Sequence, residues 1–179
     1  MIIYLHGFSS SRPDDYENIL QLKMIDTDVR CINYSTRHPL HDMSYILAET
    51  HKLVSENKDL VPMICGCGLG GYWAERVGFL CGIKQVILNP NLHPAVNMEG
   101  RIDRPEEYLS IEGKCVSEFR VKNKGRCLVF LSLNNKIVDP RQSEQELSPY
   151  YQVIWDNTSA HQFKHITPYI RQLREFKNS

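Results

Sequence analysis

The chain has 179 residues, of which 42% are hydrophobic and 23% are charged. This length and composition are typical of a single globular domain with a sizeable core, and we predict one domain spanning residues 1–179. With 21 basic and 21 acidic residues, the formal net charge is +0. The balance gives no electrostatic footprint for nucleic acid or an anionic membrane, so neither is expected as a partner.

Neither a targeting segment nor a disulfide framework is indicated. The apolar run at residues 1–5 ends at His6, which is too short for a signal peptide or a membrane span, and no basic leader precedes it. The six cysteines are scattered and form no C-x-x-C pair. Reduced, mostly buried thiols are typical of such a chain, so we place the protein in the cytoplasm and predict no metal site.

Short apolar runs alternate with segments of helical periodicity along the chain. We predict strands over residues 2–5, 29–34, 60–65, 85–88, 127–132 and 151–155, and a short helix over 114–122. Other predicted helix faces are Tyr16, Ile19, Leu20 and Met24; Met43, Ile46, Leu47, Thr50 and Val54; Leu69, Trp73, Val77 and Leu80; and Ile166, Tyr169, Ile170, Leu173 and Phe176. The alternation predicts an α/β fold, with a mostly parallel sheet of about six strands and helices on both faces.

A glycine-rich turn, GCGLGG at residues 66–71, follows the third predicted strand and opens a helix. This is the strand–turn–helix context of the G-x-S-x-G nucleophile elbow of α/β-hydrolases. The position that should carry the catalytic serine is Gly68, which has no side chain. The sequence therefore predicts a hydrolase scaffold whose nucleophile position is degenerate.

The same glycines also match two nucleotide-binding motifs. A dinucleotide site needs its G-x-G-x-x-G in the first strand–helix unit and an acidic residue about 20 positions later, where this chain has Asn89 after the next strand. A P-loop needs Lys-Ser/Thr where Tyr72 and Trp73 stand. These departures disfavour nucleotide binding, and we predict no cofactor.

Two backbone donors are expected beside the elbow. The turn after the first strand reads His6-Gly7-Phe8, and His-Gly turns at this place supply an oxyanion-hole amide in α/β-hydrolases. We predict that the N–H groups of Phe8 and Leu69 form the hole, which does not depend on side chains. Close helix–sheet packing is the structural alternative for the turn's glycines.

The remaining triad positions follow the fifth and sixth predicted strands, because the order in this fold is nucleophile, acid, base. His161 stands at the position of the base, and Asn135 stands at the position of the acid. An amide can orient an imidazole but cannot stabilise an imidazolium by charge. Asp139 is the nearest carboxylate, and its Asp-Pro-Arg-Gln context favours a helix cap.

Substitute nucleophiles are available in the sequence but are disfavoured. Cys67 precedes the elbow position by one residue, so its side chain should face the packing beside the turn. Ser9, Ser10 and Ser11 lie at the same rim, where solvated turn residues are the ordinary explanation.

Several long, irregular strings resemble the YcfP family of small bacterial proteins, which are relatives of the YqiA esterase-like proteins. They lie at residues 1–8 (MIIYLHGF), 34–39 (YSTRHP), 68–74 (GLGGYWA) and 89–92 (NPNL), and the likeness covers essentially the whole chain. The resemblance implies a compact α/β-hydrolase fold in a bacterial cytoplasm. It also implies that the YqiA-like branch has serine at position 68 and aspartate at position 135, whereas His161 matches the base.

Two functional hypotheses follow. The first is a non-catalytic or cryptic α/β-hydrolase-like protein, a pseudoenzyme, that binds a small molecule or a protein partner at the strand ends. The second is a carboxylester or thioester hydrolase that uses His161 with a displaced nucleophile or an activated water. A serine, threonine or cysteine within reach of a His161 nitrogen would favour the second hypothesis.

Overall fold

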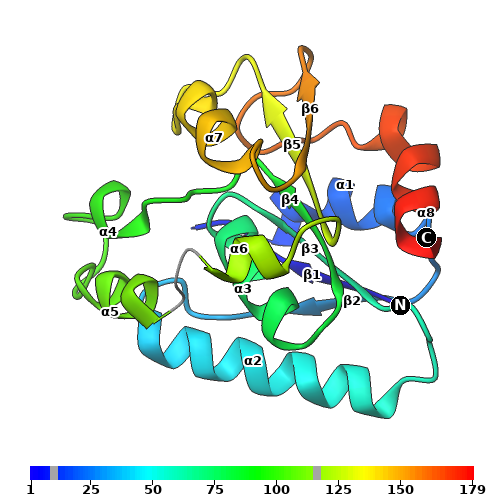
Figure 1. Ribbon diagram of the computed structural model, residues 1–179, viewed down its shortest axis with the longest axis horizontal. Coiled ribbons are helices and arrows are strands. Elements are labelled where there is room, and N and C mark those ends of the chain that lie inside the picture. Colours follow the sequence, from blue (N-terminus) through cyan, green and yellow to red (C-terminus); the bar gives the residue numbers. More distant parts are fainter. Residues whose placement is uncertain (9–11, 115–117) are drawn as a thin grey trace.

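The protein is built on a six-stranded parallel sheet in the order β2-β1-β3-β4-β5-β6 (Figure 1). The computed structural model describes residues 1–8, 12–114 and 118–179. The strands are β1 (Ile2–Leu5), β2 (Val29–Ile32), β3 (Met63–Cys67), β4 (Lys84–Leu88), β5 (Cys127–Ser132) and β6 (Gln152–Asp156). The predicted α/β class and the six parallel strands are confirmed.

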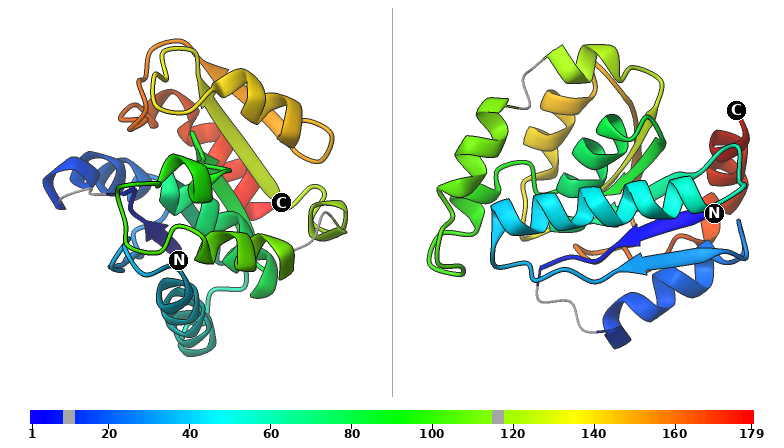
Figure 2. Two further views of the ribbon diagram at one scale, coloured as in Figure 1. Left: turned by 90° about the vertical axis from the view of Figure 1, so that its left-hand side faces the viewer. Right: turned by 90° about the horizontal axis from the view of Figure 1, so that it is seen from below.

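Helices cover both faces of the sheet (Figure 2). They are α1 (Arg12–Leu22), α2 (Pro39–Glu56), α3 (Leu69–Leu80), α4 (Pro94–Asn97), α5 (Glu107–Lys114), α6 (Glu118–Lys122), α7 (Pro140–Leu147), the 3₁₀ turn η1 (Thr167–Tyr169) and α8 (Ile170–Asn178). Alternate strand residues point to opposite faces and so feed two cores. Ile3 and Leu5 join the core under α2 and α3, while Ile2 and Tyr4 join the core under α1 and α8.

Two sequence predictions about the helices and strands need correction. The third strand starts at Met63, and Leu60 is 95% exposed, because the strand runs to the elbow and leaves the preceding segment outside the sheet. On α1, Leu22 and not Leu20 is buried, and Tyr16 and Met24 are exposed as well. Of the helix predicted over 114–122, the part at α6 is observed and residues 115–117 lie outside the described chain; α5, which precedes it, was not predicted.

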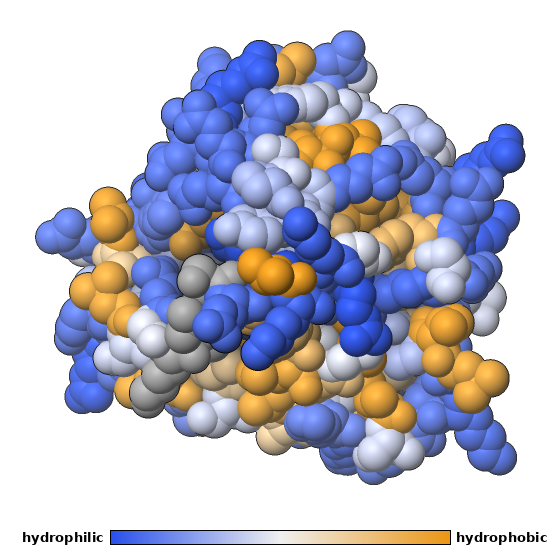
Figure 3. Space-filling model, in the orientation of Figure 1, coloured by the Kyte–Doolittle hydropathy of each residue, from blue (hydrophilic) through white to orange (hydrophobic). Residues whose placement is uncertain are grey.

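No helix in the described part of the chain is long and apolar enough to cross a membrane. Figure 3 shows apolar side chains in separate patches on a mainly polar face of the molecule.

The backbone of the first turn of α3 lies directly against the backbone at the ends of β1 and β3. A Cβ atom added at Gly70 would lie 2.2 Å from the carbonyl oxygen of Leu5, and one at Gly66 would lie 2.1 Å from the carbonyl oxygen of Gly70. Real side chains do not tolerate such distances, and the atoms in the way belong to the backbone. Glycines at these two positions therefore let the first turn of α3 sit directly on the ends of β1 and β3.

We expect Gly70→Ala to destabilise the fold by about 2–4 kcal/mol, because the added methyl must displace β1 or the helix. Gly113→Ala is the matched control, since Gly113 lies in α5 with no atom within 4 Å of the added Cβ. The control should be neutral or stabilise by up to about 1 kcal/mol. Urea denaturation measures both, and equal midpoints for Gly70→Ala and the native chain would contradict the close approach.

Candidate functional site

The turn between β3 and α3 has the left-handed backbone of a nucleophile elbow. Gly68 has φ 56° and ψ −117° and forms the N-cap of α3. Backbone groups hold it: its N–H donates to the Leu88 carbonyl oxygen at 3.0 Å, and its own carbonyl accepts from the Asn91 N–H at 2.9 Å. The conformation that presents a serine in hydrolases is thus formed here without a side chain.

His161 faces this empty position. A Cβ atom added at Gly68 would lie 3.1 Å from the Nε2 atom of His161. The other ring nitrogen, Nδ1, lies 3.1 Å from the side-chain oxygen of Asn135. The structure therefore brings Gly68, Asn135 and His161 together in the order that the sequence predicts, although their roles stay predictions.

The contacts of Asn135 define which nitrogen of the neutral imidazole carries the proton. Its Oδ1 atom also accepts from the backbone N–H groups of Ile137 at 3.0 Å and Val138 at 3.3 Å. Because these groups only donate, the oxygen must face them, and His161 must donate to it from Nδ1. In the neutral ring, the Nε2 atom is then an unprotonated acceptor, and it points toward Gly68.

Burial also lowers the pKa of His161 below its ordinary value of 6.5. Asn135 is 9% exposed and contributes no negative charge to oppose this effect. The imidazole is therefore neutral at pH 7, and the site lacks the charge that stabilises an imidazolium in a catalytic triad.

Asp156, at the end of β6, anchors the loop that carries His161. It accepts hydrogen bonds from the backbone N–H of Thr158 at 3.0 Å and from the hydroxyl of Tyr169 at 2.8 Å, and also from the N–H of Ser159. Burial raises the pKa of Asp156, but these hydrogen bonds outweigh it and lower the pKa below 3.8. An ionised carboxylate thus fixes the start of the loop.

Asn89 ties the same loop to two strands. Its side-chain amide donates to the carbonyl oxygens of Ala160 at 3.0 Å and His161 at 3.1 Å, and its oxygen accepts from the Ser132 N–H at 2.7 Å. Asn89 is 1% exposed and has φ 44°. Sequence reasoning missed the positioning roles of Asn89 and Asp156, although their places at the ends of β4 and β6 could have pointed to them.

The two predicted oxyanion donors lie at one pocket. Leu69 is the first residue of α3, so its N–H has no acceptor within the helix. Phe8, which follows β1, and Leu69 both line the pocket that contains His161. This placement agrees with an oxyanion hole, and the function of the two amides remains a prediction.

The other candidates have structural contacts. The thiol of Cys67 is directed at backbone, with its Sγ atom 3.5 Å from the His161 carbonyl oxygen and 3.4 Å from that of Gln162. The side chain of Asp139 caps α7 by accepting from the Arg141 N–H at 2.9 Å, as predicted. The rim serines at positions 9–11 lie outside the described residues.

Within the described chain, Cys65, Cys81 and Cys127 are free thiols, and Cys31 is exposed, unlike the buried Cys65, Cys67 and Cys127. Burial raises the pKa of Cys81 to about 11. Over the same residues, no group of three or more His, Cys, Asp or Glu side chains is arranged to hold a metal ion.

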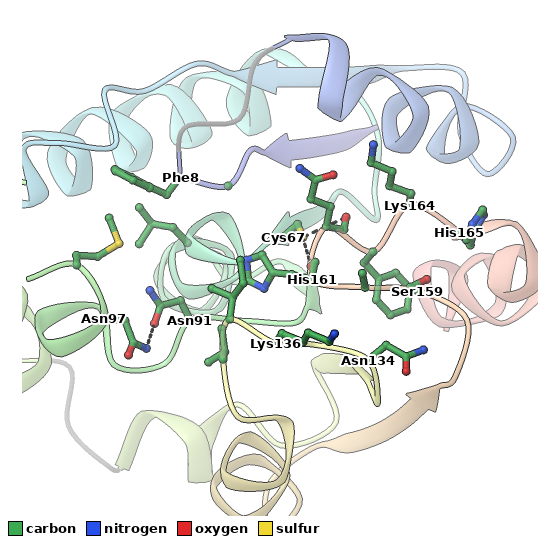
Figure 4. A pocket seen from close by; sticks show the side chains of 18 of the residues that line it. Phe8, Cys67, Asn91, Asn97, Asn134, Lys136, Ser159, His161, Lys164 and His165 are labelled. Carbon is green, nitrogen blue, oxygen red and sulfur yellow. Dashed lines mark hydrogen bonds between the residues drawn. The ribbon is translucent and has the colours of Figure 1, made fainter. Parts of the chain in front are cut away.

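A pocket of about 1060 Å³ opens above the elbow, at the carboxyl ends of the strands (Figure 4). Its described lining combines apolar, amide and basic side chains around His161. The apolar ones include Phe8, Leu69, Met98, Ile137 and Val138; the amides are Asn91, Asn97, Asn134 and Gln162; and the basic ones are Arg101, Lys136, Lys164 and His165. The volume is in the range of small-molecule sites.

Comparison with known proteins finds relatives that are similar in sequence over the whole chain. Residues 1–178 match the uncharacterised protein family UPF0227. A UPF0227 protein of Pasteurella multocida is 60% identical over 177 residues, covering 99% of both chains. The UPF0227 protein YcfP of Salmonella gallinarum is 56% identical over 177 residues, covering 99% of this chain and 98% of the relative.

Solved structures with the same fold are much more distant in sequence. Est1E from Butyrivibrio proteoclasticus superposes with a TM-score of 0.73 at 16% identity, over 98% of this chain and 85% of its own. A structure from a study of the metagenome-derived lipolytic enzymes LipS and LipT gives 0.75 at 13% identity, over 99% and 93%. These similarities show an esterase-like α/β-hydrolase fold.

We expect Asn135→Asp to raise the pKa of His161 by about 1–2 units, because a carboxylate beside Nδ1 favours the imidazolium. NMR titration of the imidazole Cε1 proton measures this. Asn134→Asp is the matched control, because the Asn134 amide donates to the Asn157 carbonyl oxygen and not to the ring.

The lowered pKa of His161 also gives the direction in which the stability of the fold changes with pH. The folded pKa of His161 is lowered, so its contribution to stability is complete above about pH 6.5 and is lost as the pH falls through the folded pKa. Asn135→Asp should reduce this loss. An unchanged titration in Asn135→Asp would contradict the contact between the two side chains.

We expect Asp156→Ala to destabilise the protein by about 2–4 kcal/mol at pH 7, because several donors lose a charged acceptor. Since the folded pKa of Asp156 is lowered, the native chain loses this advantage as the pH falls through that pKa, and the difference should narrow on the acid side. Urea denaturation at pH 7 and at lower pH tests both statements. Asp103→Ala, at an exposed aspartate, is the control and should change stability little; an equally small effect of Asp156→Ala would contradict the anchoring role.

Proposed function

This chain belongs to the UPF0227 family of uncharacterised proteins, and we propose that it uses an esterase-like fold to bind a small molecule without running acyl-transfer chemistry. The binding site is the pocket above Gly68 and His161. The proposal places the protein in the cytoplasm, where the buried thiols of Cys65 and Cys127 would stay reduced.

The backbone at position 68 carries this proposal. Covalent catalysis needs an attacking atom, and Gly68 holds the elbow conformation with none to offer. None of the described serine or threonine hydroxyls is hydrogen-bonded to the His161 ring, whose side-chain partner is Asn135. The Cys67 thiol is directed at the backbone carbonyl oxygens of His161 and Gln162.

The uncharged Asn135 supports the same conclusion. In a serine hydrolase, the acidic residue stabilises the imidazolium that forms when the base takes a proton, and replacing that acid by Asn costs about 10⁴-fold in kcat. Here the amide holds the neutral tautomer of His161. The constellation is suited to a fixed hydrogen-bond acceptor more than to proton transfer.

The site can still recognise a ligand by hydrogen bonding. The Nε2 atom of His161 would accept, and the N–H groups of Phe8 and Leu69, which line the same pocket, would donate. A group that both donates and accepts, such as a ligand hydroxyl or a bound water, would donate to the imidazole and accept from these amides.

Ester or thioester hydrolysis by an activated water is the second candidate, favoured by the unprotonated Nε2 atom. His161 would take a proton from water as the oxygen attacks the acyl carbon, and would return it to the leaving group. Without a counter-charge for the imidazolium, we expect this reaction to be slow.

Hydrolysis of p-nitrophenyl acetate tests the proposal. We expect the native chain to show little or no turnover, and turnover that is lost in His161→Ala would contradict the binding function and support the hydrolase. Mass spectrometry of protein purified under native conditions would show bound small molecules directly.

Restoring the missing groups should restore chemistry. The double variant Gly68→Ser, Asn135→Asp should hydrolyse the ester measurably faster than the native chain, with Gly68→Ser alone giving less. The imidazole must shift slightly to admit the new Cβ atom, so the gain will be limited by geometry. The matched control adds His161→Ala to the double variant and should abolish the gain. A folded double variant that hydrolyses no faster than the native chain would mean that position 68 is not a working nucleophile elbow.

A further inference from the structure

The charged side chains among the described residues that line the pocket are all of one sign. Arg101, Lys136 and Lys164 carry positive charge, and none of the described lining residues is Asp or Glu. We propose that the ligand is an organic acid, whose carboxylate or phosphate group is held by these cations. The inference rests on the proposed function, because it assigns a ligand class to the same pocket.

The one-sided charge contrasts with the rest of the chain. The whole protein has equal numbers of acidic and basic residues, and several cations elsewhere form ion pairs. Arg120 contacts Glu75 at 2.8 Å, for example, and Lys177 contacts Asp59 at 2.9 Å. Over the described residues, neither Arg101, Lys136 nor Lys164 takes part in an ion pair.

A concave site amplifies this imbalance. Low-dielectric walls focus the field of like charges into a cleft and raise the local concentration of oppositely charged ligands. Lysine and arginine side chains are also the usual donors to carboxylate and phosphate groups. An acid entering this pocket would supply the negative charge that no described lining residue provides.

The two lysines are carried by the loops that form the triad-like site. Lys136 directly follows Asn135, whose oxygen is held by Ile137 and Val138. Lys164 lies three residues after His161, and its carbonyl oxygen accepts from the Gln21 side chain at 2.7 Å. Hydrogen bonds of the folded loops therefore hold the chain next to both lysines.

Figure 4 indicates an orientation for the ligand. Lys136, Lys164 and His165 lie to one side of His161 in this view, and Phe8 lies to the other. Met98 also lines the pocket and is 2% exposed. The acidic group would lie toward Lys136 and Lys164, with an uncharged part of the molecule against Phe8.

Isothermal titration calorimetry with four eight-carbon probes tests the charge preference. Octanoate and octyl phosphate are the acidic probes, and octanol and octylamine are the neutral and basic ones. We expect the acids to bind at least about tenfold more tightly than octanol or octylamine, and to shift the NMR signals of His161. The ratio between the two acids shows whether the site prefers carboxylate or phosphate.

Charge reversal tests the assignment to these residues. Lys136→Glu with Lys164→Glu should weaken octanoate and octyl phosphate binding at least about tenfold and leave octanol unaffected. Lys52→Glu with Lys124→Glu makes the same change at exposed lysines that do not line the pocket, and should alter binding less than about twofold.

The outcomes separate the two proposals. If octanol binds as tightly as octanoate, or charge reversal at positions 136 and 164 has no effect, the pocket binds small molecules without a preference for acids, and this inference is overturned alone. If none of the four probes binds or shifts the His161 signals, both this inference and the small-molecule function fail. Rapid ester turnover by the native chain would overturn only the non-catalytic function, because an acidic substrate could still be selected by the same cations.

Discussion

The backbone contact between the first turn of α3 and the ends of β1 and β3 is the constraint on which the site depends. Gly66 and Gly70 allow distances that any Cβ atom would block, and Gly68 between them takes a left-handed φ. This turn decides where position 68 points, where the Leu69 N–H lies and how the pocket floor is shaped. All of that is backbone geometry, so it persists although the catalytic side chain is missing.

Polar side chains at the carboxyl ends of the strands hold the neighbouring loops in place around this turn. The side chain of Asn89, after β4, bridges β5 and the loop of His161. Asp156 binds the start of that loop, and Asn135 binds the imidazole. Each anchor is a polar side chain at the carboxyl end of a strand, where a parallel sheet gathers its functional loops. Several independent hydrogen bonds therefore hold His161 in position, and none of them depends on a catalytic nucleophile.

The sequence predicted the parts of this arrangement that follow from local pattern. Strand β5 was predicted at its observed bounds, because a short apolar run bounded by polar residues can be read directly. The chain order of turn, Asn135 and His161 was predictable for the same reason, since each follows a strand. The predicted buried face of α1 was wrong, because it depends on packing partners that periodicity does not show.

Other features of the site had no local signal. The hydrogen bonds of Asn89 span about 70 residues of sequence, so its place after a strand could indicate a role at the site but not which partners it contacts. The orientation of the Asn135 amide follows from two backbone N–H groups that only the folded loop presents. The gathering of Arg101, Lys136 and Lys164 around one pocket was likewise hidden by a net charge of +0, because net charge says nothing about where charges lie.

The two departures from a catalytic triad are physically consistent with each other. Once position 68 lacks a hydroxyl, no proton is delivered to His161, and no imidazolium needs a counter-charge. A carboxylate at position 135 would then favour a protonated ring and work against the burial that keeps it neutral. Asn135 retains the orienting hydrogen bond without that charge. The result is a neutral, rigidly held acceptor at the floor of a pocket whose described charged lining residues are all basic, which is a combination suited to holding a polar acid in place.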